Sequence, residues 1–113
     1  MVDPTAVSFL TLHIERDGNV AIVHCHGKLV SPQEDRLYQL LYDEISGLMV
    51  DGQKVVVDLS DLSQISDIGI GRLLELLTYA RKIGCEFELF NPSANILGFL
   101  QEAKLMKVFT VTP

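Results

Sequence analysis

The chain has 113 residues, of which 48% are hydrophobic and 21% are charged, and its formal net charge is −6. This length and composition favour one folded domain with a hydrophobic core. The negative charge argues against nucleic acid as a partner, because binding of a phosphate backbone needs a basic surface. It also argues against docking on anionic membranes, so a protein or a small molecule is the expected partner.

Cysteine usage and hydropathy place the chain in a reducing compartment. Cys25 and Cys85 lie in apolar stretches and form no C-x-x-C motif, so we expect both to be buried and reduced. The first ten residues show no signal peptide, and no apolar stretch is long enough to span a membrane. We therefore expect a cytoplasmic protein without direct membrane insertion.

Residues 8–29 read as a β-hairpin, because Asp17-Gly18 is typical of a tight turn. If Arg16 pairs with Asn19, the side chains separate into an apolar and a mixed face. The apolar face then carries Leu10, Leu12, Ile14, Ala21, Val23 and Cys25, and the mixed face carries Thr11, His13, Glu15, Ile22, His24 and His26.

Three helices and three strands are predicted after the hairpin. A helix over 31–49 begins at a Ser31 cap, and its apolar stripe is Leu37, Leu40, Leu41, Ile45 and Leu48. The valine-rich run 54–62 suits a buried strand. A helix then runs to a Gly84 cap, with Ile70, Leu73, Leu74, Leu77 and Ala80 facing inward. A strand over 86–90, a helix with Ile96, Phe99, Leu100 and Ala103 inward, and a strand over 107–111 complete the chain.

The order ββαβαβαβ predicts the fold class. Strands that alternate with helices form parallel neighbours through right-handed crossovers, while the hairpin adds an antiparallel strand. The expected fold is α/β, with a mixed β-sheet and helices mainly on one face.

The histidines are the first candidates for a metal site. His24 and His26 are two residues apart and share the mixed hairpin face with His13. Structural zinc usually needs four converging ligands, and no acidic or cysteine ligand is clearly placed with these histidines. We expect solvated histidines, no metal and no cofactor.

Three carboxylates, those of Asp58, Asp61 and Asp67, follow the end of the valine-rich strand. Ligands of α/β folds often bind at such strand ends, but acid–base catalysis needs a cleft and a second group. Asp58 is more simply a hydrogen-bonding residue that fixes the next loop. Because no complete catalytic set is visible, we do not expect an enzyme.

The turn "SDIGIG", residues 66–71, joins the valine-rich strand to the next helix. Its two glycines lack the rest of a phosphate-binding motif, so they favour a close approach of the turn to the sheet. Asp67 is well placed to cap the helix, and Ser66 is the alternative. Ile68 then becomes the first helical residue, and either a docking position on the surface or burial in the core fits the pattern.

These residues resemble the STAS domain, the fold of bacterial anti-sigma factor antagonists. The resemblance rests on the strand "VVVDLSDL", the glycine turn, the amphipathic helix after it and the segment "HGKLVSPQEDRLYQLL". It covers about residues 8–111 and implies a single STAS-like domain over 1–113. In this family an unmodified antagonist binds an anti-sigma factor that is also a serine kinase, which releases the sigma factor. Phosphorylation of the second hydroxyl in a D-S-[ST]-G turn ends that binding.

The chain departs from the family at this hydroxyl. Aligned with the D-S-[ST]-G-[LI]-G pattern, Ser66 takes the place of the aspartate, Asp67 that of the first serine, and Ile68 that of the phosphorylated residue. Isoleucine cannot accept phosphate. Ser66 is the nearest remaining hydroxyl and thus the candidate alternative phosphosite, while the sequence does not say whether Ser60 or Ser63 is modified.

Three functions follow from the resemblance and the altered turn. The first is a non-catalytic module that binds an anti-sigma factor or another STAS protein through the regulatory turn, Ile68 with Ser66, Asp67 and Gly69. Its partner-binding residues are then Asp67, Ile68, Ile70 and Arg72. The second is a scaffold or subunit of a signalling assembly or a lipid-transport ATPase, with the Ile22 face as a second interface. The sequence leaves open whether the chain forms a homodimer. The third is a ligand sensor or enzyme that uses the acidic turn.

Overall fold

The computed structural model describes residues 11–29 and 35–113. Its elements are β1 (Thr11–Asp17), β2 (Val20–Leu29), α1 (Asp35–Ser46), β3 (Lys54–Ile65), α2 (Asp67–Ile83), β4 (Glu86–Phe90), α3 (Ala94–Glu102) and β5 (Thr110–Thr112). The predicted order ββαβαβαβ is therefore confirmed. The predicted cap Ser31 lies outside the described residues.

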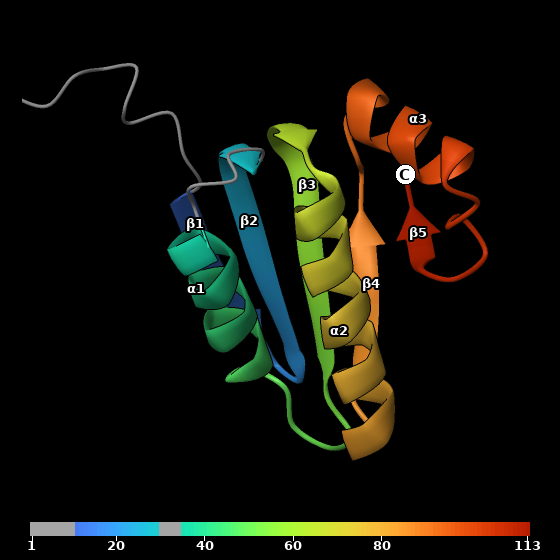
Figure 1. Ribbon diagram of the computed structural model, residues 1–113. Coiled ribbons are helices and arrows are strands. Elements are labelled where there is room, and N and C mark those ends of the chain that lie inside the picture. Colours follow the sequence, from blue (N-terminus) through green and yellow to red (C-terminus); the bar gives the residue numbers. More distant parts are fainter. Residues whose placement is uncertain (1–10, 30–34) are drawn as a thin grey trace, which may run out of the picture.

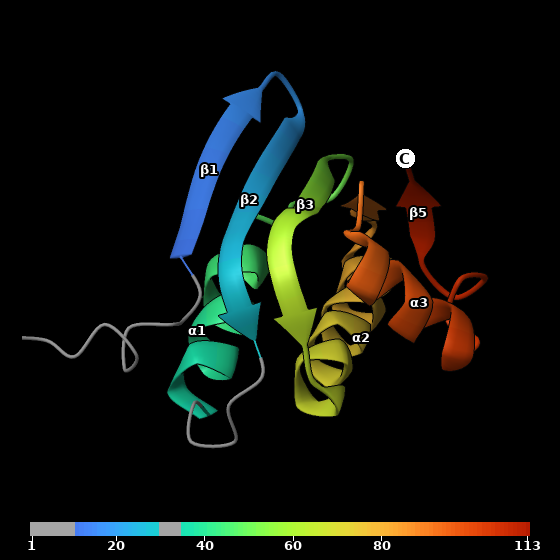
Figure 2. The same ribbon diagram turned by 90° about the horizontal axis from the view of Figure 1, so that it is seen from above.

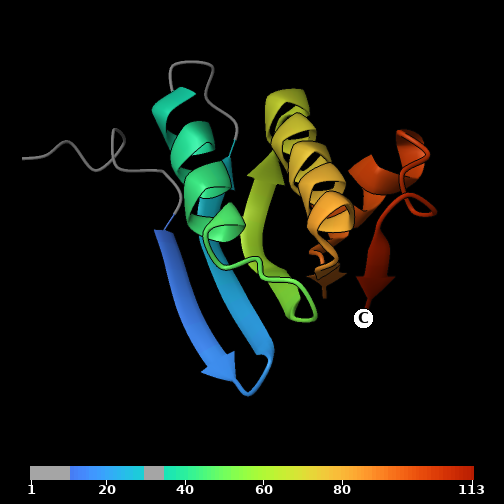
Figure 3. The ribbon, with the colours of Figure 1, turned by 90° about the horizontal axis from the view of Figure 1, so that it is seen from below.

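The five strands form one mixed sheet in the order β1-β2-β3-β4-β5. β1 is antiparallel to β2, and every other neighbouring pair is parallel. Each crossover moves to the next strand in the same direction, so right-handed connections bring the helices to one face. α1 and α2 lie on that face in front of the sheet (Figure 1), and the views from above and below agree (Figures 2 and 3). The predicted mixed sheet with helices mainly on one face is confirmed.

The hairpin turn lies one residue farther along the chain than predicted, which moves the pairing register by two residues. Asp17 pairs with Val20, whereas the expected pair was Arg16 with Asn19. Gly18 has a φ of 59°, so the tight turn is centred on the residues after Asp17. Because the shift is an even number of residues, every described side chain stays on its predicted face.

The helical faces are close to those expected, with two corrections. Leu41 and Ile45 of α1 are buried as predicted, but Leu40 is 49% exposed. Tyr38, at helical spacing from Leu41 and Ile45, occupies the core in its place and has no exposed surface. In α2 the fully buried Leu76 joins the predicted inward residues, because α1 and the strands β3 and β4 enclose this helix.

The C-terminal part also differs from the prediction. Ile96 and Leu100 of α3 are buried as predicted, whereas Ala103 is exposed because α3 has already ended. The last strand begins at Thr110, three residues after the predicted start. Phe109 just before it is buried and packs with Phe87, so the core holds this segment although it forms no strand.

β3 is longer than predicted because a bulge lets it continue to Ile65. His24 pairs with Asp58 but His26 pairs with Asp61, so β3 contains one extra residue between them. The side chain of Asp58 accepts hydrogen bonds from the amide of Ser60 at 3.0 Å and from its hydroxyl at 2.7 Å. These bonds take the Ser60 amide out of the ladder, as expected for a bulge. Asp58 thus fixes the segment after it, as predicted.

A histidine–carboxylate network lies on the sheet face opposite α1 and α2. His24 Nδ1 is 2.6 Å from Asp58 Oδ2, and His24 Nε2 is 3.0 Å from Glu15 Oε1 in an ion-pair contact without hydrogen-bond alignment. The ring of His13 stacks on that of His24 at 5.9 Å between centroids. The expectation that these histidines lack acidic neighbours is wrong, because the parallel pairing of β2 and β3 brings Asp58 to His24.

This network shifts two pKa values in opposite directions. The hydrogen bond to Asp58 raises the pKa of His24 above its ordinary 6.5, although burial acts the other way. Burial alone would raise the pKa of Asp58, but hydrogen bonds from Ser60 and His24 lower it below 3.8. Within the described residues, no group of three or more His, Cys, Asp or Glu side chains is arranged to hold a metal.

Cys25 and Cys85 are buried and form no disulfide, as predicted. Burial, with a smaller contribution from the charge of Asp58, raises the pKa of the Cys25 thiol to about 12. The thiolate that reacts with oxidants and metals is therefore disfavoured at this position. None of the helices in 35–113 is both long and apolar enough to cross a bilayer.

The pKa shifts predict a pH dependence of stability. The raised pKa of His24 gives a contribution that is complete below pH 6.5 and is lost as the pH rises through the folded-state pKa. The lowered pKa of Asp58 gives a second stabilising contribution, which is complete above pH 3.8 and is lost as the pH falls through the folded-state pKa of Asp58. We expect the urea midpoint to fall as the pH rises above 6.5, and His24→Asn to remove this slope.

The matched control is His13→Asn, which changes a more exposed histidine of the same face and is expected to keep the slope. If the urea midpoint of His24→Asn changes with pH in the same way as that of the unmodified protein, the network does not stabilise the fold through a protonated His24.

Candidate functional site: the strand–helix turn

The turn between β3 and α2 is organised by Ser66. This residue has extended dihedral angles, φ −94° and ψ 172°, and its Oγ accepts a hydrogen bond from the Gly69 amide at 3.2 Å. Its carbonyl oxygen accepts from the Ile70 amide at 3.0 Å, which closes the first helical turn. Ser66 is therefore the N-cap, and the prediction that favoured Asp67 is corrected. A serine fits because its short side chain reaches back to the free amide.

Asp67 is the first residue of α2, and its side chain is exposed. A carboxylate in the first turn is favoured by the positive end of the helix dipole. Since Ser66 performs the capping, the Asp67 carboxylate stays on the surface, where a partner can reach it.

Tyr38 of α1 connects the turn to the other helix. Its hydroxyl lies 2.7 Å from Ser66 Oγ, and its ring is fully buried. The Ser66 hydroxyl is thus engaged by both an aromatic side chain and a helix amide. Sequence reasoning missed this contact, because it joins residues of two different helical units and no local motif signals it.

The two isoleucines of the turn have opposite environments. Ile68 is 44% exposed, while Ile70 is 4% exposed and belongs to the hydrophobic core. Helical geometry explains the difference, since residues two apart point to different sides of a helix. Ile70 is therefore corrected from a partner-binding residue to a core residue, and Gly69 is also buried. The accessible part of the turn consists of Asp67 and Ile68.

Arg72 lies one helical turn beyond Ile68. Its Nη1 is 3.1 Å from Glu75 Oε2, an exposed ion pair along the helix. Its Nε is buried without a hydrogen-bond partner. Arg72 thus borders the turn, with its guanidinium already held by Glu75.

The three carboxylates that the sequence groups near the strand end take different partners. Asp58 binds His24 and Ser60, and Asp61 Oδ2 lies 3.1 Å from His26 Nδ1. Asp67 lies on α2 at the turn. Asp58 and Asp61 thus contact histidines of β2 and not Asp67. Among the residues that the structure describes, these three carboxylates do not form an acid–base pair at the turn.

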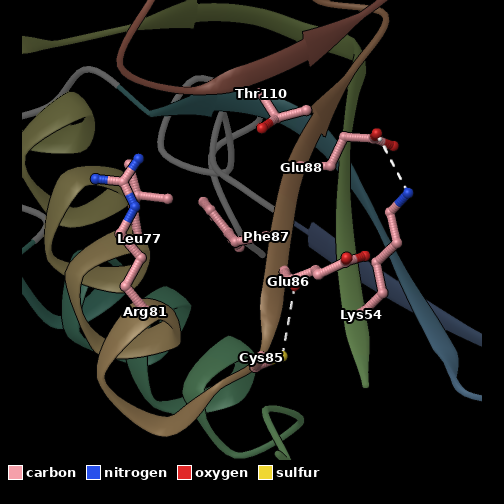
Figure 4. Close-up of a pocket in the computed structure, with 8 residues that line it drawn as sticks. All are labelled: Lys54, Leu77, Arg81, Cys85, Glu86, Phe87, Glu88 and Thr110. Carbon is pink, nitrogen blue, oxygen red and sulfur yellow. Dashed lines mark hydrogen bonds and ion pairs between the residues drawn. The ribbon is translucent and has the colours of Figure 1, made fainter. Parts of the chain in front are cut away.

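A pocket of about 350 Å³ lies away from the turn, beside the first half of β4 (Figure 4). Three of its charged groups already have partners: Lys54 Nζ is 3.3 Å from Glu88 Oε1, and Arg81 donates to the Val108 carbonyl at 3.2 Å. Leu77 and Phe87 form its apolar wall. This pocket gives no support to the hypothesis of a ligand sensor at the acidic turn.

We predict that Ser66→Ala lowers the free energy of unfolding by about 1–2 kcal/mol, because it removes the helix cap and a hydrogen-bond partner of Tyr38. Urea denaturation measures the loss. Ser66→Thr keeps the hydroxyl and is the matched control, with a smaller expected loss. A Ser66→Ala variant as stable as the unmodified protein contradicts this role of the hydroxyl.

Comparison with known proteins identifies the family to which this chain belongs. The STAS domain model matches residues 11–113. An anti-sigma factor antagonist from Mycobacterium paratuberculosis gives a TM-score of 0.75 at 18% identity, over 95% of this chain and 88% of that chain. SpoIIAA, an anti-sigma factor antagonist in its unphosphorylated form, gives 0.71 at 15%, over 91% and 89%. The murine Solute Carrier 26 family member A9 anion transporter gives 0.60 at 22%, over 74% of this chain and 14% of the transporter.

At these identities the structural likeness establishes the fold. The family model reaches from β1 to the end of the chain and includes the turn described above. The resemblance found in the sequence is thereby confirmed, and the chain belongs to the STAS domain family.

Proposed function

We propose that this chain is a non-catalytic regulatory module that binds a protein partner through the turn at residues 66–72. The observation that carries the proposal is the exposure of Ile68, which is 44% accessible at the first turn of α2. Leaving a large apolar side chain in water is unfavourable, and burial against a partner recovers that free energy. Asp67 beside it supplies a charge that selects the partner.

The proposed partner is an anti-sigma factor of the kind that also acts as a serine kinase, or another STAS protein. The structural likeness to two anti-sigma factor antagonists supports this class. The module then acts in the cytoplasm, as a constitutively binding member of the partner-switching pathways that regulate transcription in this family.

The turn lacks the usual means of release. A phosphate disrupts a docking surface because it brings nearly two negative charges that must be desolvated. Ile68 stands at the position of the family's phosphorylated hydroxyl and has no atom to carry phosphate. The Ser66 hydroxyl is already bound to Tyr38 and to the Gly69 amide, so a kinase would have to act on an oxygen that has two partners inside the fold. We therefore propose a module that stays in its binding-competent state.

A second candidate function is a scaffold or subunit of a larger assembly. The observation in its favour is the likeness to a region of an anion transporter, of which this chain covers 14%. The sheet face that carries Ile22 and the histidine network then provides a second interface. Stable association with a large complex distinguishes this function from the first.

We predict that Ile68→Glu weakens retention of the partner by at least about tenfold and leaves the Tm nearly unchanged, because the side chain is exposed and the charge enters an apolar contact. The measurement is an affinity pull-down from the native cell, followed by titration of the retained protein. Val50→Glu is the matched control, since Val50 is 49% exposed and lies in the connection from α1 to β3. A large loss of stability in Ile68→Glu would make Ile68 a core residue and end the docking proposal.

We also predict that incubation with the retained kinase and ATP leaves residues 66–69 without phosphate. Phosphopeptide mapping measures the outcome, with a D-S-[ST]-G antagonist of the same kinase as positive control. Phosphate on Ser66 contradicts the proposal of a turn that phosphorylation cannot release.

A further inference from the structure

β1 is an edge strand that lacks several of the features that usually keep such strands from pairing. The order of the described strands ends at β1, which pairs with β2 on its inner side (Figures 2 and 3). Backbone groups on the outer side of an edge strand can pair with another strand, so proteins interrupt such edges with prolines, lysines or bulges. Residues 11–17 contain neither proline nor lysine, and their register with β2 is continuous. A further strand can therefore extend the sheet beside β1.

The charges of β1 indicate which strand fits this edge. His13 and Glu15 lie on the open face of the sheet, and their side chains are 68% and 57% exposed. Directly opposite residues of antiparallel strands place their side chains on the same face, where opposite charges attract. If a second copy of β1 lies antiparallel to the first with the two-fold axis at Ile14, His13 of each copy lies opposite Glu15 of the other. The strand is thus complementary to itself, which favours a second copy of this chain as the occupant.

Other registers of the same pair are less favourable. With the axis at His13, the two His13 side chains lie opposite each other and away from the carboxylates. With the axis at Glu15, two carboxylates lie opposite each other, and like charges in this position destabilise a sheet. A shift by a single residue would bring the apolar face of one strand to the polar face of the other. The axis at Ile14 is therefore the register that the charges select.

The helix face of β1 supports the same register. Leu12 and Ile14 are half-buried and pack against the hydrophobic core, so part of each side chain stays in water at the edge. With the axis at Ile14, the two Ile14 side chains meet, and the stem of Arg16 covers Leu12 of the other copy. Burial of this remaining apolar surface stabilises the pair.

We propose that the chain forms a homodimer in which the β1 strands of two copies pair antiparallel about Ile14 and join the two sheets into one. The proposed docking turn follows β3, two strands away from this edge, so both copies keep it accessible. The homodimer is therefore independent of the proposed function. A seven-residue ladder is a small interface, so the expected dimer is reversible, with a dissociation constant on the order of micromolar.

Sedimentation equilibrium of the full chain, over about a hundredfold range of concentration around micromolar, measures the dissociation constant. His13→Glu is expected to weaken the dimer about tenfold, because two carboxylates then face each other at two places. His13→Lys is expected to tighten it about threefold, because a permanent positive charge then faces Glu15. Thr78→Glu and Thr78→Lys are the matched controls: Thr78 is exposed on α2, and these changes alter the net charge equally without moving the dissociation constant.

Disulfide trapping measures the register. Ile14→Cys is expected to give a covalent dimer on mild oxidation, because opposite Cα atoms of antiparallel strands lie about 4.5–5.5 Å apart, within reach of a disulfide. Leu12→Cys is the matched control, since the two new cysteines then lie about 13 Å apart along the strands. It is expected to crosslink at least about tenfold more slowly than Ile14→Cys. The native Cys25 and Cys85 are buried and do not compete.

Three results overturn the homodimer. The first is an unmodified chain that stays monomeric throughout the concentration range. The second is a dimer whose dissociation constant does not respond to the changes at His13, or is raised by both His13→Glu and His13→Lys. The third is crosslinking of Ile14→Cys no faster than that of Leu12→Cys. Because no partner protein enters these measurements, each of these results leaves the proposed function standing.

Discussion

The Ser66 hydroxyl connects three elements at the point where the proposed function is located. It follows β3, caps the first turn of α2 through the Gly69 amide, and contacts Tyr38 of α1 at 2.7 Å. Because a helix start is defined by the residue that satisfies its free amides, this one side chain decides where α2 begins. The exposure of Ile68 depends on that starting point.

The length of β3 is the second constraint, since it determines where Ser66 is delivered. The register between β2 and β3 shifts twice, between His24 and His26 and between Gly27 and Lys28, and each shift changes the face that the following residues of β3 would take. His24 holds Asp58 from the neighbouring strand at 2.6 Å. The His24–Asp58 contact on one face of the sheet thus supports the path of β3, and β3 leads into the turn that starts α2 on the other face.

The site combines a capped helix start with an exposed hydrocarbon side chain at position 68. In the antagonists that this sequence resembles, the residue aligned with Ile68 carries a hydroxyl. Phosphorylation of that hydroxyl adds the charge that controls binding. Here the same position carries a hydrocarbon, and the neighbouring hydroxyl of Ser66 is used for capping. Under the proposed function, the affinity of this surface depends on apolar contact with Ile68 and on the charge of Asp67. Regulation, under the proposed function, then acts through the partner or its concentration.

The sequence by itself determined the order of elements, the mixed sheet and the family, because hydrophobic periodicity, turn residues and helix caps are local signals. It also located the altered turn and excluded phosphate at Ile68. Only the tertiary structure decided that Ser66 caps α2, that Ile70 is core while Ile68 is exposed, and that Tyr38 and His24 meet Ser66 and Asp58. These contacts join residues far apart in the chain, and their formation depends on the sheet register and on the packing of α1 beside α2, which no local pattern encodes.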